Sequence, residues 1–205
     1  MSIRQLQRDG PVDPIRVQRA MEVIDRQSDK LARLVVQLLD VARIQAGRLD
    51  LNREQVELTD MVAGVVANAQ ASTTKHNLIL RTPSSVWASV DPIRLEQVVT
   101  NLVDNAIKYS PGGGDIEVDL VESRSGGVQL SVRDHGIGIP AEQRGRIFDR
   151  FYQVDNGGRA GGMGLGLYIS RHIVELHGGR IDVEAPQGGG TRFVVSLPPE
   201  GVGAP

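Results

Sequence analysis

Within the first fifty residues, one set of mostly apolar positions recurs at alternating steps of four and three. This heptad seam comprises Val17, Met21, Ile24, Ser28, Leu31, Val35, Leu38, Ala42 and Gln45. Such a repeat is typical of a long helix in a coiled coil or helical bundle. Asp13 suits the N-cap, so we predict one helix from Pro14 to Gly47. A helix with one apolar seam needs a partner, and residues 3–8 are too few to supply it.

Beyond residue 54 the pattern changes to that of a mixed α/β region. Helical spacing occupies 59–72, 92–109 and 164–177, and strand alternation occupies 77–82, 86–90, 115–122, 127–134, 180–185 and 191–197. Short glycine-containing links between neighbouring strands favour hairpins. We therefore predict an α+β fold, a two-layer α/β sandwich with a mixed, largely antiparallel sheet and helices on one face. A long helix of a helical-bundle domain precedes it. The expected parts are 1–50, 51–199 and a disordered tail at 200–205.

Composition narrows the classes of partner. The chain has 205 residues, a net charge of -2, interspersed charges and no cysteine. The absence of a basic stripe argues against nucleic acid as a partner. Without cysteine there is no disulfide, thiolate metal site or cysteine nucleophile. No apolar run approaches the roughly 20 residues needed to span a bilayer, so we expect no membrane contact by this chain.

A run of glycines precedes the last predicted helix. Residues 161–168 read GGMGLGLY, and the helical spacing starts within them. Each glycine costs a helix about 1 kcal/mol relative to alanine. A floppy linker would explain the glycines, but so would a backbone that approaches a phosphate at the helix N-terminus.

Two strand ends carry polar side chains on an otherwise apolar face. In 127–134 the alternation places Asp134 in line with three apolar residues, and in 191–197 it places Thr191 in the same way. A buried carboxylate needs a hydrogen-bond donor. A turn aspartate bonded to its own backbone and a threonine chosen for strand propensity remain the alternatives.

A polar stripe follows one face of the helix predicted at 92–109. Asn101, Asn105 and Lys108 recur at steps of four and three beside the apolar stripe. An ordinary solvated face would look the same. Amide oxygens for a hard cation and an ammonium for phosphate are nevertheless the parts that a site for Mg²⁺ and a nucleotide needs.

Four segments, in order, resemble the boxes of sensor histidine kinases. They are NLVDNAIKYS, DHGIGIP, RIFDRFYQ and GGMGLGLYISRHIVELHGG, and the likeness continues into GGGTRFVVSLP. A lone glycine motif would be weak evidence, whereas four ordered boxes are specific. Residues 54–198 are similar to the catalytic ATP-binding domain, a Bergerat-type fold. Residues 1–50 are similar to part of the dimerisation and phosphotransfer domain.

The resemblance implies a role for each matching residue. Asp134 would accept a hydrogen bond from the adenine amine, with Thr191 assisting through water. Asn105 would bind Mg²⁺. Asn101 and Lys108 would help to position phosphate, Asn101 either directly or through a neighbouring residue; no residue is assigned as catalytic. The expected nucleotide contacts are Asn101, Asn105, Lys108, Tyr109, Asp134, Gly136, Gly138, Arg150, Gly162, Gly164, Leu165, Gly166, Leu167 and Thr191. Residues 152–163 would form a lid with Phe148 and Phe151 at its near edge.

The remaining conspicuous side chains are expected to be structural. We assign all four histidines, His76, His135, His172 and His177, to structural or solvated roles. Trp87 is expected to pack in the sheet. The family's phosphoacceptor segment, a histidine followed by acidic, apolar and arginine residues, has no counterpart here. We expect the acceptor to lie outside this chain, because MSIRQLQ resembles the segment that comes directly after that box in the family.

The predicted function is the ATP-binding catalytic region of a sensor histidine kinase, with ATP or ADP and Mg²⁺ as cofactors. A nucleotide-binding scaffold, a degenerate kinase or a slow ATPase remain alternatives. An anti-sigma-factor serine kinase shares the fold, but the long first helix counts against it. The expected partners are ATP, the receiver domain of a response regulator and a second copy of the full-length kinase. We expect a cytoplasmic location, whether or not the parent protein is anchored in a membrane.

Overall fold

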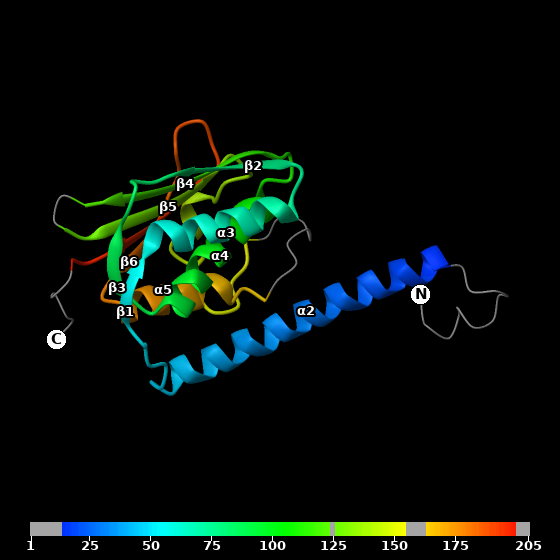
Figure 1. Ribbon diagram of the computed structural model, residues 1–205, viewed down its shortest axis with the longest axis horizontal. Coiled ribbons are helices and arrows are strands. Elements are labelled where there is room, and N and C mark those ends of the chain that lie inside the picture. The colour runs from blue at the N-terminus through cyan, green and yellow to red at the C-terminus, as the bar shows by residue number, and fades with distance from the viewer. Residues whose placement is uncertain (1–13, 124–125, 155–162, 200–205) are drawn as a thin grey trace. The chain divides into compact units, whose positions relative to one another are not determined.

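The structure is a computed structural model that describes residues 14–123, 126–154 and 163–199. The chain divides into two compact units, Met1–Ala42 and Arg43–Pro205. Most of the first unit is helix α2, Pro14–Gln45, which runs without a break (Figure 1). Its apolar seam is exposed at Met21, Leu31 and Val35. The predicted cap Asp13 lies outside the described residues.

Helix α2 ends as its sequence predicts. Gly47 adopts a φ of 62°, a left-handed conformation that glycine takes without strain. The amide of Gly47 donates to the carbonyl of Ile44 at 3.0 Å, and the amide of Arg48 donates to that of Arg43 at 2.9 Å. None of the described helices has the length and apolar character that a bilayer span requires.

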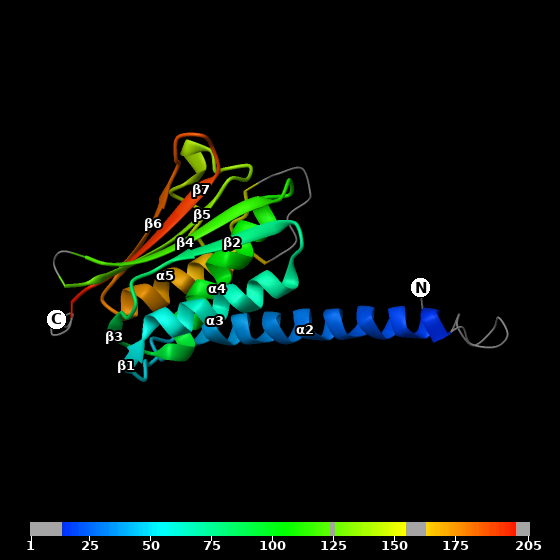
Figure 2. The same ribbon diagram turned by 45° about the horizontal axis from the view of Figure 1, so that its top comes forward.

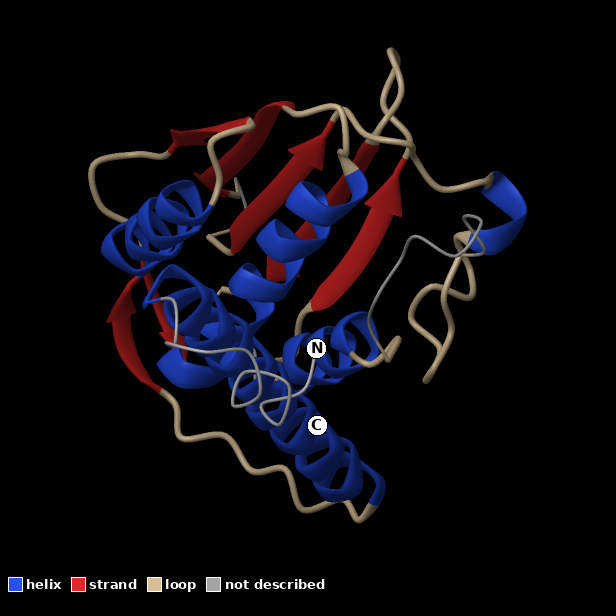
Figure 3. Ribbon diagram, turned by 90° about the vertical axis from the view of Figure 1, so that its right-hand side faces the viewer, coloured by secondary structure: helices blue, strands red, loops and turns tan. Residues whose placement is uncertain are grey.

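The second unit is a two-layer sandwich, as predicted. Its elements are β1 (Glu54–Glu57), α3 (Leu58–Ser72), β2 (His76–Arg81), β3 (Trp87–Val90), α4 (Pro92–Tyr109), β4 (Gly114–Glu122), β5 (Val128–Asp134), the 3₁₀ turn η1 (Ala141–Gln143), α5 (Gly166–Leu176), β6 (Arg180–Glu184) and β7 (Thr191–Leu197). The strand order in the main sheet is β2-β4-β5-β7-β6. Only β2 and β4 pair in parallel, and the other neighbours are antiparallel. Helices α3, α4 and α5 cover one face of this sheet (Figures 2 and 3).

The small second sheet was not predicted. Strand β1 pairs with β3 in an antiparallel two-stranded sheet apart from the main one. Trp87, expected to pack in the sheet, is the first residue of strand β3, and its side chain is 58% exposed. Trp87 stands opposite Glu57 in this short sheet, where one face remains open to solvent.

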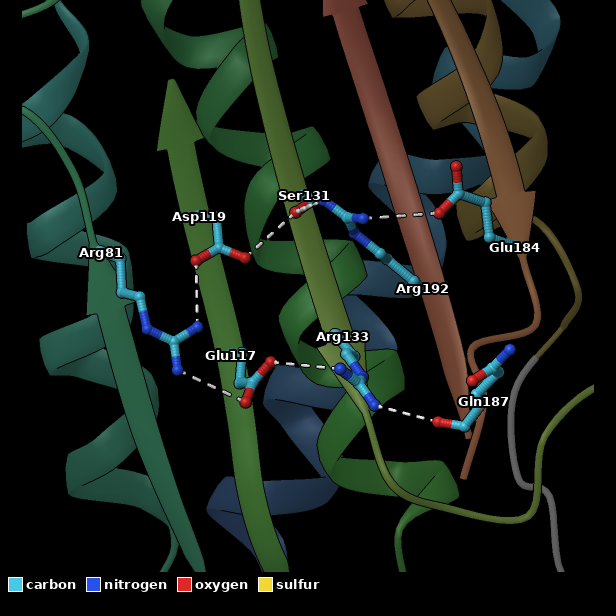
Figure 4. Close-up of polar contacts among 8 residues, drawn as sticks. All are labelled: Arg81, Glu117, Asp119, Ser131, Arg133, Glu184, Gln187 and Arg192. Carbon is cyan, nitrogen blue, oxygen red and sulfur yellow. Dashed lines mark hydrogen bonds and ion pairs between the residues drawn. The ribbon is translucent and has the colours of Figure 1, made fainter. Parts of the chain in front are cut away.

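The two faces of the main sheet differ as the alternation requires. The inner face is buried against the helices and is built from Ile116, Val118, Leu120, Val128, Leu130, Val132, Phe193, Val195 and Leu197. The outer face carries charged side chains that bridge neighbouring strands, and Figure 4 shows this network. Arg81 bridges Glu117 at 3.4 Å and Asp119 at 3.2 Å. A shift of one residue in any strand would exchange these faces, so the pattern fixes the register.

Candidate functional site: a cleft between the sheet and helices α4 and α5

Asp134 and Thr191 face each other where the central strands meet the site. They are register partners at the end of β5 and the start of β7. Asp134 is 3% exposed, and its Oδ1 accepts the amides of Gly136 at 2.8 Å and Thr191 at 3.2 Å. Burial raises the pKa of the Asp134 carboxyl, and the two backbone hydrogen bonds offset part of this rise. Among the described residues no donor reaches Oδ2, so this oxygen is available to a ligand.

The loop after Asp134 lies directly on the C-terminus of α4. The amide of Ile137 donates to the carbonyl of Tyr109 at 3.1 Å. A Cβ on Gly136 would lie 2.1 Å from that carbonyl oxygen, so only glycine permits this approach. The glycine thereby joins the strand end that carries Asp134 to the helix that carries Asn105.

A cleft that is partly open to solvent lies between these elements. Its walls are Asn105, Tyr109, Asp134, Gly138, Ile139, Ile147, Tyr152, Gln153, Val154, Leu167, Thr191 and Phe193. Phe148 is buried behind this wall and packs edge-on against Phe193, with ring centroids 6.4 Å apart. Mostly apolar walls with a few polar groups are typical of a small-molecule site.

The other end of the cleft is formed by the first turn of α5. Leu167 from this turn lines the cleft, and Leu165 at the N-cap position provides no side-chain cap. The first turn also contains no acidic residue. Backbone amides and the helix dipole therefore offer positive partial charge at this end, as an anion requires.

One known protein family matches the part of the chain that builds this cleft. Residues 90–201, which include α4, the cleft and β7, match the family described as histidine kinase-, DNA gyrase B-, and HSP90-like ATPase. The chain belongs to this family. The match spans the elements that build the site, from the strand before α4 to the end of β7.

The relatives place the chain among sensor histidine kinases. Sensor protein SrrB of Staphylococcus aureus strain N315 is 38% identical over 196 residues, which cover 93% of this chain and 33% of SrrB. The chain thus spans about a third of the length of the curated relatives it matches. Among solved structures, the mycobacterial sensor histidine kinase MprB is 30% identical, with a TM-score of 0.65 over 71% of this chain and 97% of that one. Full-length ShkA in complex with AMPPNP is 27% identical, with a TM-score of 0.73 over 88% of this chain and 38% of that one. The chain therefore carries the ATP-binding domain of a sensor histidine kinase.

Six of the predicted contact residues line the cleft of this ATP-binding domain. They are Asn105, Tyr109, Asp134, Gly138, Leu167 and Thr191. Gly136 and Gly164 shape the adjoining backbone, and Leu165 is buried, so only its main chain is available to a ligand. Gly162 and the central part of the predicted lid, 155–162, lie outside the described residues, as does the predicted tail at 200–205.

Four other predicted residues lie beside the cleft without lining it. Lys108 Nζ lies 3.1 Å from the hydroxyl of Tyr109 and above its ring. The guanidinium of Arg150 lies 5.1 Å from the ring centroid of Phe151. Asn101 donates from Nδ2 to Ser170 Oγ at 2.9 Å, and Gly166 packs against the same amide.

Phe151 does not anchor the lid edge with its side chain, which is exposed. The Phe151 amide donates to the carbonyl of Gly164 at 3.0 Å, which joins the two ends of 152–163. Phe151 takes a φ of 63° there, a left-handed conformation that is uncommon for a residue other than glycine.

Five wall residues were not named as nucleotide contacts from the sequence: Ile139 and Ile147 had no assignment, and Tyr152, Gln153 and Val154 fell within the predicted lid. These residues come from irregular segments, where no periodicity tells inward from outward. Phe193 is different, because the alternation of the last strand places it on the same face as Thr191. That alternation was a usable signal for a sixth wall residue.

Two of the histidines are buried in structural roles, as predicted. His177 donates from Nδ1 to the carbonyl of Ile173 at 2.8 Å and accepts the amide of Asp91 at Nε2 at 2.9 Å. Both ring nitrogens are thus engaged in the neutral form, and burial lowers the pKa of His177. His76 contacts Thr73 Oγ1 and the carbonyl of Ser110. His172 Nδ1 contacts the carbonyl of Tyr168 on its own helix, and His135 is exposed.

Proposed function

We propose that the chain binds ATP together with Mg²⁺ and presents its γ-phosphoryl group for transfer to a histidine outside this chain. The observation that carries the proposal is the buried Asp134 carboxylate, with Oδ2 available at the apolar end of a cleft whose other end is a helix N-terminus. An acceptor in an apolar wall suits a base with an exocyclic amine. The uncapped helix suits phosphate.

The end of the cleft that contains Asp134 is expected to distinguish adenine from guanine. Asp134 Oδ1 is engaged by two backbone amides, which fixes the carboxylate and leaves Oδ2 to accept from the adenine amine. Guanine presents a carbonyl acceptor at the matching ring position. Two acceptors facing each other in a desolvated site would leave both unpaired, which costs about 1–3 kcal/mol.

The phosphate end fits a hard cation held by few protein ligands. Among the described residues no group of three or more histidine or acidic side chains could hold a metal ion. Mg²⁺ commonly uses one or two protein ligands together with substrate phosphates and water, and the Asn105 side chain lines the cleft where such a ligand is needed. When bound, Mg²⁺ neutralises charge on the phosphate oxygens. Asn105 would orient it, and Lys108 would leave Tyr109 to reach phosphate.

The acceptor and the downstream partner are inferred from the family. We infer that the accepting histidine belongs to the dimerisation and phosphotransfer helices of the complete kinase. His76 and His177 hold structural hydrogen bonds here, and none of the four histidines of this chain lies in a segment like the family's histidine box. The phosphoryl group would then pass to the receiver domain of a response regulator. The exposed seam of α2 would pair with helices of the same domain and of a second copy, with the site on the cytoplasmic side of any membrane.

Rapid ATP hydrolysis is disfavoured by one residue of α4, which leaves at most a slow ATPase as an alternative. A water-activating base would be needed one helical turn before Asn105. Asn101 occupies this position, and its amide donates to Ser170. An amide does not accept a proton at neutral pH, so hydrolysis is expected to be slow.

The test of the proposal has two stages. Calorimetric titration in Mg²⁺ should show ADP binding at least tenfold tighter than GDP, and equal affinities would contradict the assignment of Asp134. Radiolabelled ATP is then added to the chain alone and to the chain with a longer protein that contains the family's histidine box. Acid-labile label is expected only on the histidine box. No label in the presence of bound nucleotide would favour the scaffold alternative.

A further inference from the structure

Ser170 is a buried polar residue that the proposed function leaves without a role. It lies one turn inside α5 and is 2% exposed, while its neighbours Ile169 and Ile173 belong to the core. A serine at such a position loses its contacts with water and needs a hydrogen-bond partner. Its Oγ accepts from the side-chain amide of Asn101 on α4 at 2.9 Å.

The other side of the same amide touches the start of α5. A Cβ on Gly166 would lie 2.1 Å from Asn101 Oδ1, which is closer than any real side chain allows. Gly166 and Ser170 are four residues apart and therefore share one face of the helix. The Asn101 amide thus lies across the first turn of α5, against the glycine at one end and bonded to the serine at the other.

This Asn101–Ser170 bridge is one helical turn from the nucleotide cleft. Asn105 follows Asn101 by four residues on the same stripe of α4, and it lines the cleft. Leu167, the next residue after Gly166, lines the cleft from α5. One turn is about 5.4 Å, so the bridge fixes how far the α5 N-terminus stands from Asn105. Both must reach the same phosphate groups, and small errors in such spacing are costly.

We propose that Ser170 is a positioning residue of the phosphate end of the site, acting through Asn101 to hold the first turn of α5 beside Asn105. The inference rests on the proposed function, because it assumes that phosphate lies between these two elements. It also gives Asn101 a role in holding the two helices together, which is one way to give the help in positioning phosphate that the resemblance implied.

The distinguishing readout is the dependence of binding on the phosphate chain. Ser170→Ala should weaken binding of the non-hydrolysable analogue AMPPNP roughly 3- to 10-fold, as expected for one lost hydrogen bond that aligns a site. AMP, which relies mainly on the adenine end, should bind within about twofold of the unmutated protein. Calorimetric titration measures AMPPNP, and displacement titration measures the weaker AMP.

Ser131→Ala is the matched control. Ser131 is 1% exposed and hydrogen-bonded by Arg192 at 3.1 Å on the outer face of the sheet, away from the cleft. It should lower the melting temperature as much as Ser170→Ala does, without changing either affinity. Ser170→Cys keeps nearly the same volume with a weaker acceptor, and its AMPPNP affinity should fall between serine and alanine. If Ser170→Ala fails to fold, the cysteine variant carries the comparison.

The outcomes distinguish a failure of the positioning role of Ser170 from a failure of the proposed function. If Ser170→Ala and Ser170→Cys weaken AMP and AMPPNP equally, or neither, the positioning role is refuted while nucleotide binding stands. If the unmutated protein does not bind AMPPNP in Mg²⁺, the proposed function itself fails.

Discussion

Replacing Asp134 by asparagine should separate nucleotide affinity from stability. The substitution keeps the shape of the side chain and removes its charge. Asparagine Oδ1 can still accept the amides of Gly136 and Thr191, which lie 2.8 and 3.2 Å from the native oxygen. The second oxygen becomes an NH₂ group. The local backbone is therefore retained, while the atom available to a ligand changes from acceptor to donor.

Asp134→Asn should weaken the binding of ADP but should not lower the free energy of unfolding. A hydrogen bond to a charged acceptor contributes about 1.5–3 kcal/mol, which corresponds to a loss of roughly 10- to 150-fold in affinity for ADP. Two facing donors, the new amide and the adenine amine, prevent a substitute bond. Folding should not suffer, because burial already raises the pKa of the Asp134 carboxyl. A raised folded-state pKa means that the native state disfavours the charge at neutral pH, and asparagine removes this cost.

The assay pairs calorimetric titration of ADP with urea denaturation of the ligand-free protein at pH 7. The variant should bind ADP at least tenfold more weakly and unfold at the same or a higher urea concentration. Thr191→Val, which keeps the strand and removes a hydroxyl, is the control for general damage to the cleft and should lose less affinity. Unchanged ADP affinity in the asparagine variant would refute the adenine contact. A large loss of stability would refute the reasoning from burial.

Three further outcomes test other parts of the structure. Asn105→Ala should abolish most of the Mg²⁺-dependent gain in ADP affinity while leaving metal-free binding nearly unchanged, as titrations with Mg²⁺ and with EDTA would show. Because burial holds the pKa of His177 below its value of 6.5 in the unfolded chain, the unfolded state binds the proton first, so the free energy of unfolding should fall as the pH drops below 6.5. His177→Gln should reduce this loss, which for one proton is at most about 1.4 kcal/mol per pH unit in denaturation curves. Gly64→Ala should stabilise helix α3 by about 0.5–1 kcal/mol, because an added Cβ there meets no other atom. Gly190→Ala should lower the free energy of unfolding by more than about 1 kcal/mol, because Gly190 has a φ of 79° and an added Cβ would lie 1.9 Å from the carbonyl oxygen of Asp134.

Periodicity predicted the regular elements because burial and periodicity have the same cause. The helix expected at 92–109 is α4, residue for residue, since Asp91 accepts the amide of Arg94 at its N-cap as the sequence suggests. The predicted strands differ from the observed ones by at most one residue at either end, and 191–197 coincides with β7. Strand β1 was not predicted, because three of its four residues are polar and the sequence therefore shows no alternation of apolar and polar positions there.

The site was only partly predictable, for a physical reason. Asp134 and Thr191 could be found because each replaces an apolar residue in an otherwise regular row. The walls at Ile147 and Tyr152 lie in turns whose direction depends on tertiary contacts, such as the bond from the Phe151 amide to Gly164. A pattern along the chain carries no information about such contacts, and only a resemblance or a structure supplies it.

The polar stripe of α4 shows where spacing stops being informative. Asn101, Asn105 and Lys108 are equivalent in the sequence, since each lies on one face of the same helix. In the structure each has a different neighbour: Asn101 meets Ser170, Asn105 faces the cleft, and Lys108 folds over Tyr109. The difference arises because the first turns of α5 pack against α4 at Asn101, so the stripe is covered there and opens toward the cleft one turn later. The same residue type therefore joins two helices at one position and is left available to a ligand at the next.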